Sequence, residues 1–158
     1  MQKYLVSLVV GIALASQLGC GTDSVAEDPP VFREDYAATY QEVRNCRWSL
    51  EHDLVRIRVL ASPDAVTPYT GRGVPFPTGA IIIKEQYDED DTSCSGPIVD
   101  YTVMQKLAEG SSPETLGWTW QKVDADHTTI KTDLERCTRC HTSCGVAPDG
   151  YDGTCALP

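Results

Sequence analysis

The residues most able to do chemistry stand close together near the end of the chain, in the sequence Cys137-Thr138-Arg139-Cys140-His141. Two thiols at this spacing can each add across a vinyl group of a haem, on neighbouring pyrrole rings. The histidine that follows then lies beneath the iron and offers its imidazole as the proximal ligand. The pattern therefore predicts one covalently attached haem c, held by Cys137 and Cys140, with His141 on the iron.

Two other uses of this cysteine pair fit the rest of the sequence less well. A structural zinc site needs a second ligand pair of similar spacing, but Cys144 and Cys155 are far apart and His127 stands alone. A thioredoxin-like redox pair needs a βαβ context, and the sequence pattern does not provide one. The spacing therefore favours haem attachment.

The sixth coordination position of such an iron has few candidate ligands. Once a leader is removed, Met104 is the remaining methionine, and His52 and His127 are the other histidines. Met104 lies within an apolar strand pattern, where core packing is the simpler role. Both histidines stand beside acidic residues in turn-like sequence, which favours solvated side chains. We therefore expect a five-coordinate iron with an open distal face, and ligation by Met104 is the alternative.

The N-terminal segment predicts export rather than a part of the fold. Lys3 supplies a positive start, and the uncharged apolar run from Tyr4 to Leu18 is short for a membrane span but typical of a signal peptide. We expect residues 1–19 to be this signal peptide. Residues 20–32 are polar and acidic, and they are expected to form a tether between membrane and domain.

The end of the apolar run also predicts a lipid anchor. Leu18-Gly19-Cys20 resembles the bacterial lipobox, in which the cysteine is lipidated and becomes the new N-terminus, although Gln17 replaces the usual leucine. The alternative is ordinary cleavage that leaves a free thiol at Cys20. Lipidation would place the protein in the bacterial cell envelope, facing the periplasm or the outside.

Four further cysteines remain in this expected oxidising setting, which suits two disulfides. The loop between Cys144 and Cys155 is short and rich in Gly, Asp and Pro, so this pair closes easily. Pairing of Cys46 with Cys94 then completes the set. Free buried thiols are the alternative, and they are less common outside the cytoplasm.

Composition limits the class of partner. The chain has 158 residues, 41% of them hydrophobic, which is enough for one domain with a core. Its formal net charge of −10 would repel nucleic acids and anionic lipid surfaces. A small neutral or cationic ligand or a basic redox protein fits better, and the lipid anchor is the expected link to a membrane.

Hydrophobic periodicity predicts an α+β domain in which strands dominate. Tyr36, Tyr40 and Val43 recur at helical spacing, which predicts a helix over residues 33–47. We expect strands over residues 53–61, with one buried face, and over 80–87, 98–107 and 116–123, with a Gly- and Pro-rich loop over 69–79. Thr132 is a suitable N-cap for a short helix through Cys140. The order of helix, four strands and helix indicates an antiparallel sheet domain over residues 33–158.

Several segments in this order resemble the cytochrome P460 family, which also includes the β-type cytochromes c′. The resemblance covers about residues 53–141, and its most specific part is an F-P-x-G element followed by Lys-Glu, upstream of the C-terminal C-x-x-C-H. The segments that carry it are Val55-Arg56-Ile57-Arg58-Val59, Ser62-Pro63-Asp64, Pro75-Phe76-Pro77-Thr78-Gly79, Ile81-Ile82-Ile83-Lys84-Glu85, Asp100-Tyr101-Thr102-Val103-Met104, Gly117-Trp118 and Cys137-x-x-Cys140-His141. The resemblance implies a homodimeric antiparallel β-sheet domain that binds haem near its C-terminus.

The resemblance also implies a role for Lys84. In cytochrome P460 itself, a lysine of the Lys-Glu strand is covalently joined to the haem macrocycle, and the enzyme oxidises hydroxylamine; Lys84 is the matching residue. Strand parity puts Lys84 on the same face as Ile82, from which it could reach inward, and an exposed lysine at the end of the strand is the alternative. The β-type cytochromes c′ lack this cross-link and bind nitric oxide at an open iron.

Two departures from the family pattern bear on the expected reaction. Cytochrome P460 is thought to use a distal carboxylate on the third strand as a proton acceptor, and the counterpart here is Gln105, which cannot titrate. Glu85 carries a carboxylate, but strand parity sends it to the face opposite Lys84. Two additional cysteines, Cys144 and Cys155, also follow His141 in place of the family's usual ending.

The sequence as a whole predicts a lipid-anchored haem c protein whose open iron oxidises small nitrogen species such as hydroxylamine, with Lys84 as the catalytic modifier of the haem. A non-enzymatic binder of nitric oxide is the alternative, and an electron-transfer cytochrome is a third possibility. The expected partners are a small nitrogen-containing ligand or substrate, a redox protein and a second copy of the chain.

Overall fold

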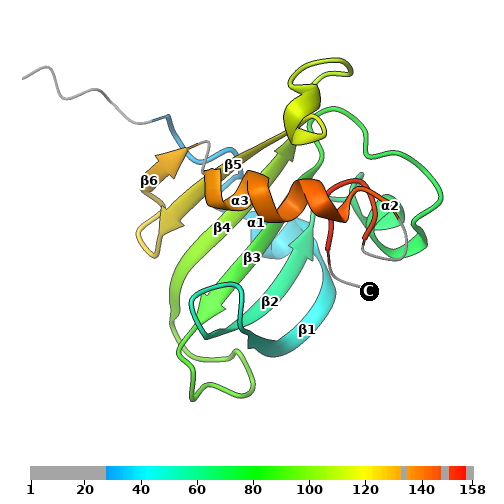
Figure 1. The fold of residues 1–158 in the computed structure, drawn as a ribbon. Helices are drawn as coiled ribbons and strands as arrows, with labels where there is room; N and C mark the ends of the chain where they lie inside the picture. Colours follow the sequence, from blue (N-terminus) through cyan, green and yellow to red (C-terminus); the bar gives the residue numbers. More distant parts are fainter. Residues whose placement is uncertain (1–27, 133–134, 147–149, 156–158) are drawn as a thin grey trace, which may run out of the picture.

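Among the residues that the structure describes, six antiparallel strands form one sheet in the order in which they occur in the chain (Figure 1). The computed structural model describes residues 28–132, 135–146 and 150–155. The strands are β1 (Gln41–Ser49), β2 (Val55–Ala61), β3 (Ile81–Tyr87), β4 (Ile98–Lys106), β5 (Trp118–Asp124) and β6 (Thr129–Thr132). The expected signal peptide, Cys20 and most of the expected tether lie outside the described residues.

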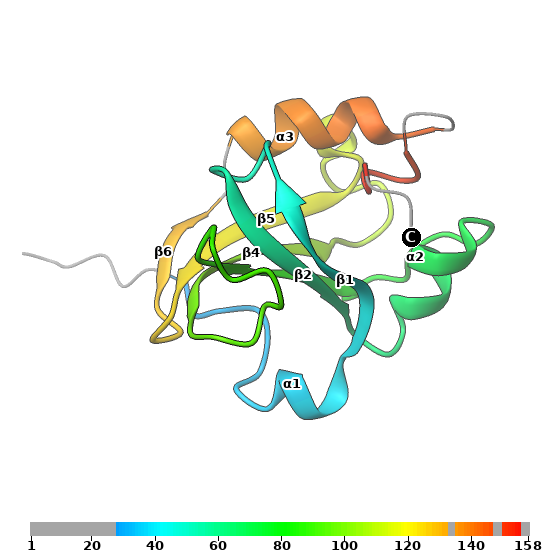
Figure 2. The ribbon, with the colours of Figure 1, turned by 90° about the horizontal axis from the view of Figure 1, so that it is seen from below.

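Helices lie on both faces of the sheet. Helix α3 (Glu135–His141) crosses one face, and α1 (Tyr36–Thr39) lies on the other (Figure 2). The other helical segments are α2 (Val66–Gly71), η1 (Pro113–Thr115) and η2 (Thr142–Cys144). No helix in the described ranges is long and apolar enough to cross a membrane. The predicted fold class, a strand-dominated α+β domain with a short C-terminal helix, is confirmed.

The sheet separates two hydrophobic cores, because its central strands bury side chains on both faces. The core on the α3 side contains Ile57, Val59, Ile82, Met104, Trp118 and Trp120, with Tyr69 and Phe76 from outside the strands. The core on the α1 side contains Leu60, Ile81, Ile83, Tyr101, Val103 and Val123, covered by Phe32 and Tyr36. The β-branched side chains that dominate β2 and β3 suit such a doubly buried position.

The predicted strands at residues 53–61, 80–87, 98–107 and 116–123 correspond to β2, β3, β4 and β5. The expectation of one buried face for the first of these was incomplete, since Val59 and Leu60 point to opposite faces and are both buried. Central strands covered on both sides lose the alternation of polar and apolar residues that identifies a single buried face.

The predicted helix over residues 33–47 is wrong for most of its length. Only Tyr36–Thr39 is helical, and the chain then continues as β1 in antiparallel pairing with β2. The register of this pairing shifts between Glu42 and Arg44 and again between Arg44 and Arg47. These irregularities break the two-residue repeat, so the sequence of β1 lacks the alternation by which a strand is normally recognised.

The short elements that the sequence analysis missed include β6 and α2. Strand β6 is mostly exposed and adds an edge to the sheet, with Thr132 as its last residue rather than as a helix cap. Helix α2 begins within the segment before the expected loop, and Pro68 lies in its first turn, where proline is tolerated. Both elements are too short to give a periodic pattern.

Both expected disulfides are present. Cys46–Cys94 links β1 to the loop between β3 and β4, and Cys144–Cys155 closes the C-terminal segment after α3. Among the described residues, Cys137 and Cys140 are the free cysteines. The pairing therefore leaves unpaired the two thiols to which the sequence assigns haem attachment.

Replacement of Cys46 and Cys94 by serine should lower the free energy of unfolding by about 2–4 kcal/mol, because the bridge constrains a long loop of the unfolded chain. Denaturant unfolding of the oxidised protein measures this change. The exposed neighbour Thr92 provides the control, since Thr92→Ala keeps the bridge and should change stability little. An unfolding midpoint that stays at the wild-type value in the double serine variant would contradict the prediction.

Candidate functional site

Helix α3 brings the predicted haem-attachment residues to the face of the sheet. Cys140 is exposed and Cys137 is half-buried, whereas the His141 side chain is buried. The Nε2 atom of His141 lies 3.5 Å from the Nζ atom of Lys84 on β3. The structure thus brings together residues 57 positions apart in sequence, which the family resemblance had placed at one site.

A backbone hydrogen bond fixes the orientation and tautomer of His141. The Nδ1 atom of its ring lies 2.6 Å from the Gly153 carbonyl oxygen. A carbonyl can only accept, so Nδ1 must carry the proton and Nε2 must present its lone pair toward the sheet. Burial, together with the charge of Lys84, lowers the pKa of His141 to about 4. The imidazole is therefore neutral at pH 7, as a metal ligand must be.

Strand parity sends Lys84 to the α3 side of the sheet, as predicted. Lys84 pairs with Val59 of β2 and Thr102 of β4, so it occupies a central position rather than the frayed end of a strand. Burial lowers the pKa of its amine to about 8. A substantial fraction of the amine is consequently unprotonated, and nucleophilic, at slightly alkaline pH.

His52 is a site residue that the sequence analysis missed. Its position in a charged turn predicted a solvated ring, but its Nε2 lies 2.9 Å from the Lys84 Nζ atom and its Nδ1 lies 2.7 Å from the Ser49 hydroxyl. Burial, and then the charges of Lys84 and His141, lowers the pKa of His52 to about 3. The loop between β1 and β2 folds over the site and brings His52 to it. No local pattern in the sequence predicts this position of the loop.

A small cavity of about 30 Å³ lies between α3 and the sheet. Its walls combine hydrophobic side chains with a few polar groups, and its lining residues are His52, Ile82, Lys84, Thr102, Val103, Met104, Trp120, Cys137 and His141. The lining contains no aspartate or glutamate. The cavity can therefore hold a small neutral ligand, and its own lining supplies no carboxylate to accept a proton.

The chemistry of the residues that line this cavity fits a haem. The Cys137 thiol and the neutral His141 imidazole line the same cavity together with apolar residues, and the second free thiol, Cys140, is exposed on the same helix. The Trp120 Nε1 atom is buried and has no hydrogen-bond partner among the described residues, so it offers a donor to a bound group. The volume holds about one water molecule. A porphyrin therefore fits only with α3 and the sheet further apart than they are here.

Other residues considered from the sequence lie away from the cavity. Gln105 pairs with Ile81 and Thr119, which places it on the opposite face of the sheet from Met104. Glu85 also lies on that face, as predicted, and is buried. His127 is not solvated as expected, because its Nε2 lies 3.1 Å from the Tyr101 hydroxyl on the α1 side. Gln105 therefore cannot act on a ligand in this cavity.

Met104 has the core position that the sequence favoured, and ligation by Met104 stays an untested alternative. It is buried in the core on the α3 side and also lines the cavity. The zinc alternative receives no support, since the described residues contain no group of three histidine, cysteine or acidic side chains able to hold a metal ion.

A comparison with known protein families identifies the family of this chain. The family model described as cytochrome P460 matches residues 34–147, which is most of the chain. The chain belongs to the cytochrome P460 family. Membership implies a haem cofactor and confirms the resemblance that the sequence motifs suggested. A search of curated proteins finds no match.

In this cytochrome P460 family member, the match spans α1 to η2 and therefore includes Lys84, His52 and the Cys137–His141 segment. It ends before the described residues 150–155, which supply the Gly153 carbonyl and Cys155. The contact that orients His141 thus comes from a part of the chain beyond the family match.

Proposed function

We propose that this cytochrome P460 family protein attaches one haem through Cys137 and Cys140, uses His141 as the proximal iron ligand and oxidises small nitrogen species such as hydroxylamine. The observation that carries the proposal is the position of Lys84, whose buried amine lies 3.5 Å from the His141 Nε2 atom. This amine therefore lies on the side of the imidazole that would face the iron, in the region that a bound haem would occupy.

The cysteine inventory supports covalent attachment. Four of the described cysteines form disulfides, whereas Cys137 and Cys140 remain as thiols on one turn of α3. Each thiol would add across one vinyl group, with sulfur bonding to carbon and the thiol hydrogen moving to the neighbouring carbon. No oxidant is consumed and no atom is lost in this addition.

Bound haem would supply a redox-active iron, and the residues of the chain control its surroundings. His141 is neutral at pH 7 and presents Nε2 as a ligand. Ile82, Met104 and Trp120 form an apolar wall that limits the entry of water. His52 holds the Lys84 amine through a 2.9 Å hydrogen bond and so keeps the amine directed into the cavity.

Lys84 would modify the haem through a bond from its amine nitrogen to a carbon of the macrocycle. Nitrogen and carbon would each lose one hydrogen in this step, and the two electrons would pass to an oxidant such as hydrogen peroxide. The low pKa of the amine, about 8, favours the unprotonated form that attack requires. Such a bond would disturb the planarity and conjugation of the porphyrin.

The protein with this bond should show a ferrous absorption band far to the red of ordinary haem c, and it should oxidise hydroxylamine. Lys84→Ala should restore an ordinary spectrum and abolish oxidation, while nitric-oxide binding is retained. Lys131→Ala, which removes an exposed lysine of β6, is the matched control and should leave both properties unchanged. An ordinary haem c spectrum in the wild type would exclude the oxidase proposal.

The absence of a carboxylate from the cavity lining favours a second candidate, a nitric-oxide binder without turnover. Loss of a general base typically costs about 10²-fold or more in rate when proton removal limits the reaction. If Lys84 is not bonded to the haem, the same open iron would bind nitric oxide as the β-type cytochromes c′ do. Hydroxylamine turnover by the wild-type protein separates the two candidates.

The ferric iron should be high-spin and five-coordinate, because both ring nitrogens of His52 already have hydrogen-bond partners and Met104 packs in the core. Electron paramagnetic resonance of the ferric protein measures the spin state. The variants His52→Ala and Met104→Ala should leave a high-spin spectrum. A low-spin wild-type spectrum that becomes high-spin in either variant would instead identify a sixth ligand and support electron transfer.

We further propose that the protein is held at the membrane of a bacterial cell envelope by lipid on Cys20, with its domain facing the periplasm or the outside. It would exchange electrons with a redox partner and form a homodimer. In a bacterial host, Cys20→Ser should prevent incorporation of labelled fatty acid and release the protein from the membrane fraction. Wild-type protein without label would indicate simple secretion.

A further inference from the structure

A turn near the C-terminus makes the closest described contact with the His141 ring. The Gly153 carbonyl oxygen lies 2.6 Å from His141 Nδ1, in a buried position. This turn, Tyr151–Thr154, closes on itself through backbone hydrogen bonds between its first and last residues. It lies beyond residues 34–147, so nothing in the family match accounts for it.

The backbone and a disulfide tie this turn to the end of α3. The Gly153 amide donates to the Cys144 carbonyl, and the Asp152 amide donates to the Gly145 carbonyl. The Cys144–Cys155 disulfide then joins the residues on either side of the turn. The turn therefore lies within the loop that this disulfide closes, and His141 stands three residues before the loop begins.

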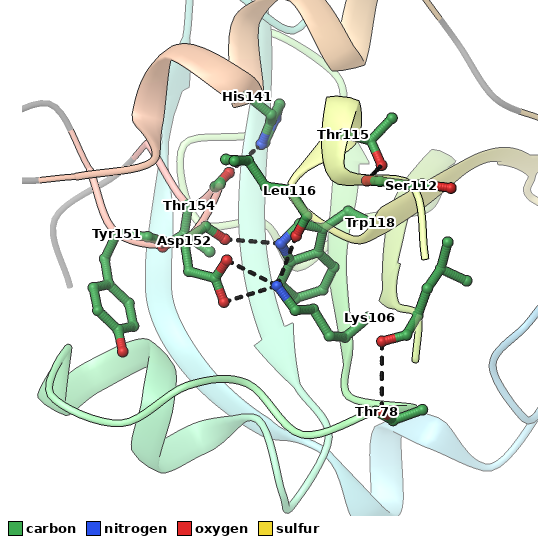
Figure 3. A network of polar contacts seen from close by, with 12 residues as sticks. Thr78, Lys106, Ser112, Thr115, Leu116, Trp118, His141, Tyr151, Asp152 and Thr154 are labelled. Atoms are coloured by element: carbon green, nitrogen blue, oxygen red, sulfur yellow. Dashed lines mark hydrogen bonds and ion pairs between the residues drawn. The ribbon is translucent and has the colours of Figure 1, made fainter. Parts of the chain in front are cut away.

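A lysine of the sheet holds the turn from the other side (Figure 3). Lys106 Nζ lies 2.8 Å and 2.9 Å from the two carboxylate oxygens of Asp152, and it also donates to the Leu116 carbonyl at 2.8 Å. Trp118 Nε1 donates to the Asp152 carbonyl at 2.8 Å. Two neighbouring strands, β4 and β5, thus fix the residue immediately before Gly153.

Two independent features favour glycine at position 153. Its φ of +83° lies in the left-handed region that residues with a Cβ atom rarely adopt. A Cβ atom there would also lie 3.1 Å from the Trp118 indole, which is itself buried and held by hydrogen bonding. A larger residue would therefore have to displace the Trp118 indole by a few tenths of an ångström or move the Gly153 carbonyl that contacts His141.

From these contacts we propose that the Tyr151–Thr154 turn is a positioning element for the proximal histidine, with Gly153, Asp152 and Lys106 as its positioning residues. The hydrogen bond from Nδ1 to a carbonyl fixes the tautomer of a ligating imidazole and increases its electron donation to the metal. The turn would therefore strengthen the bond from His141 to iron and stabilise the ferric state. This inference depends on the proposed role of His141 as the proximal ligand.

Gly153→Ala in the holoprotein tests the carbonyl contact without changing any charge. We expect a downward shift of the iron–histidine stretching frequency in the resonance Raman spectrum of the ferrous protein and an upward shift of the midpoint potential. Gly110→Ala is the matched control, because Gly110 has a similar φ of +77° but nothing within 4 Å of the added Cβ. Both variants share the backbone strain, but only Gly153→Ala should move the frequency and the potential.

Lys106→Met tests the positioning role by removing the contact between β4 and Asp152 of the turn. This variant serves as the test if Gly153→Ala fails to fold. Lys106→Met should lower the iron–histidine frequency and raise the midpoint potential. Lys106→Arg, which keeps a donor for Asp152, should return both quantities toward wild-type values. Arg58→Met is the control, since it removes one positive charge and one ion pair with Glu85 on the other face of the sheet. This control should destabilise the protein without moving the iron–histidine frequency.

Wild-type frequency and potential in correctly folded Gly153→Ala, or in Lys106→Met if the glycine variant does not fold, would overturn the inference. Failure of the proposed function gives a different result. In that case the wild-type protein itself lacks covalent haem or shows no iron–histidine band, whatever residue occupies position 153.

Discussion

The Glu85 carboxylate, buried within the sheet domain, accepts hydrogen bonds from the Tyr36 hydroxyl at 2.8 Å and the Tyr87 hydroxyl at 2.7 Å, and it pairs with Arg58 at 2.6 Å. A buried carboxylate is costly unless several donors surround it, so this arrangement fixes which face of β3 points toward α1. Because side chains alternate along a strand, the preceding residue, Lys84, must then point to the α3 face. The register of β3 against its neighbours thus determines both the position of the site and its chemistry.

The two faces of the sheet consequently have different properties. On the α1 face, three donors form hydrogen bonds with the Glu85 carboxylate, and aromatic rings lie around it. This carboxylate is therefore fully partnered, and we assign it no catalytic role. On the α3 face, two histidines and one lysine share a small cavity, and burial lowers the pKa of all three groups. Neutral nitrogen ligands and a nucleophilic amine are the expected result. The cavity is therefore suited to a metal-centred cofactor and a small uncharged ligand.

The sequence predicted the central strands and the Cys144–Cys155 disulfide from local patterns, and it predicted Cys46–Cys94 as the pair that remained. The β-branched run of β3 and the spacing of Cys144 and Cys155 are examples. It failed at β1, where irregular pairing removes the two-residue repeat, and at β6, which is short and exposed. These errors arise because pairing with a neighbouring strand, rather than local preference, decides the structure of such segments.

The candidate site was predictable in part for the same physical reason. The C-x-x-C-H spacing and the parity of Lys84 can be read locally, and the structure brings these residues together. His52 and Gly153 reach the site from loops whose paths depend on tertiary packing, so no pattern in the sequence identified them. Gln105 was assigned by correspondence along the chain, and its register with Ile81 and Thr119 places it on the wrong face.

The central claim is that a haem is bonded to Cys137 and Cys140, and the intact mass of the reduced, denatured protein tests it most directly. Thiol addition loses no atoms, so the mass should exceed that of the polypeptide by one haem, or by one haem less two hydrogens if Lys84 is also bonded. Variants that lack Cys144 and Cys155 should retain this added mass, whereas a variant in which Cys137, Cys140 and Lys84 are all replaced should lose it. A wild-type mass equal to that of the polypeptide alone, from cells that assemble other c-type cytochromes, would contradict the claim.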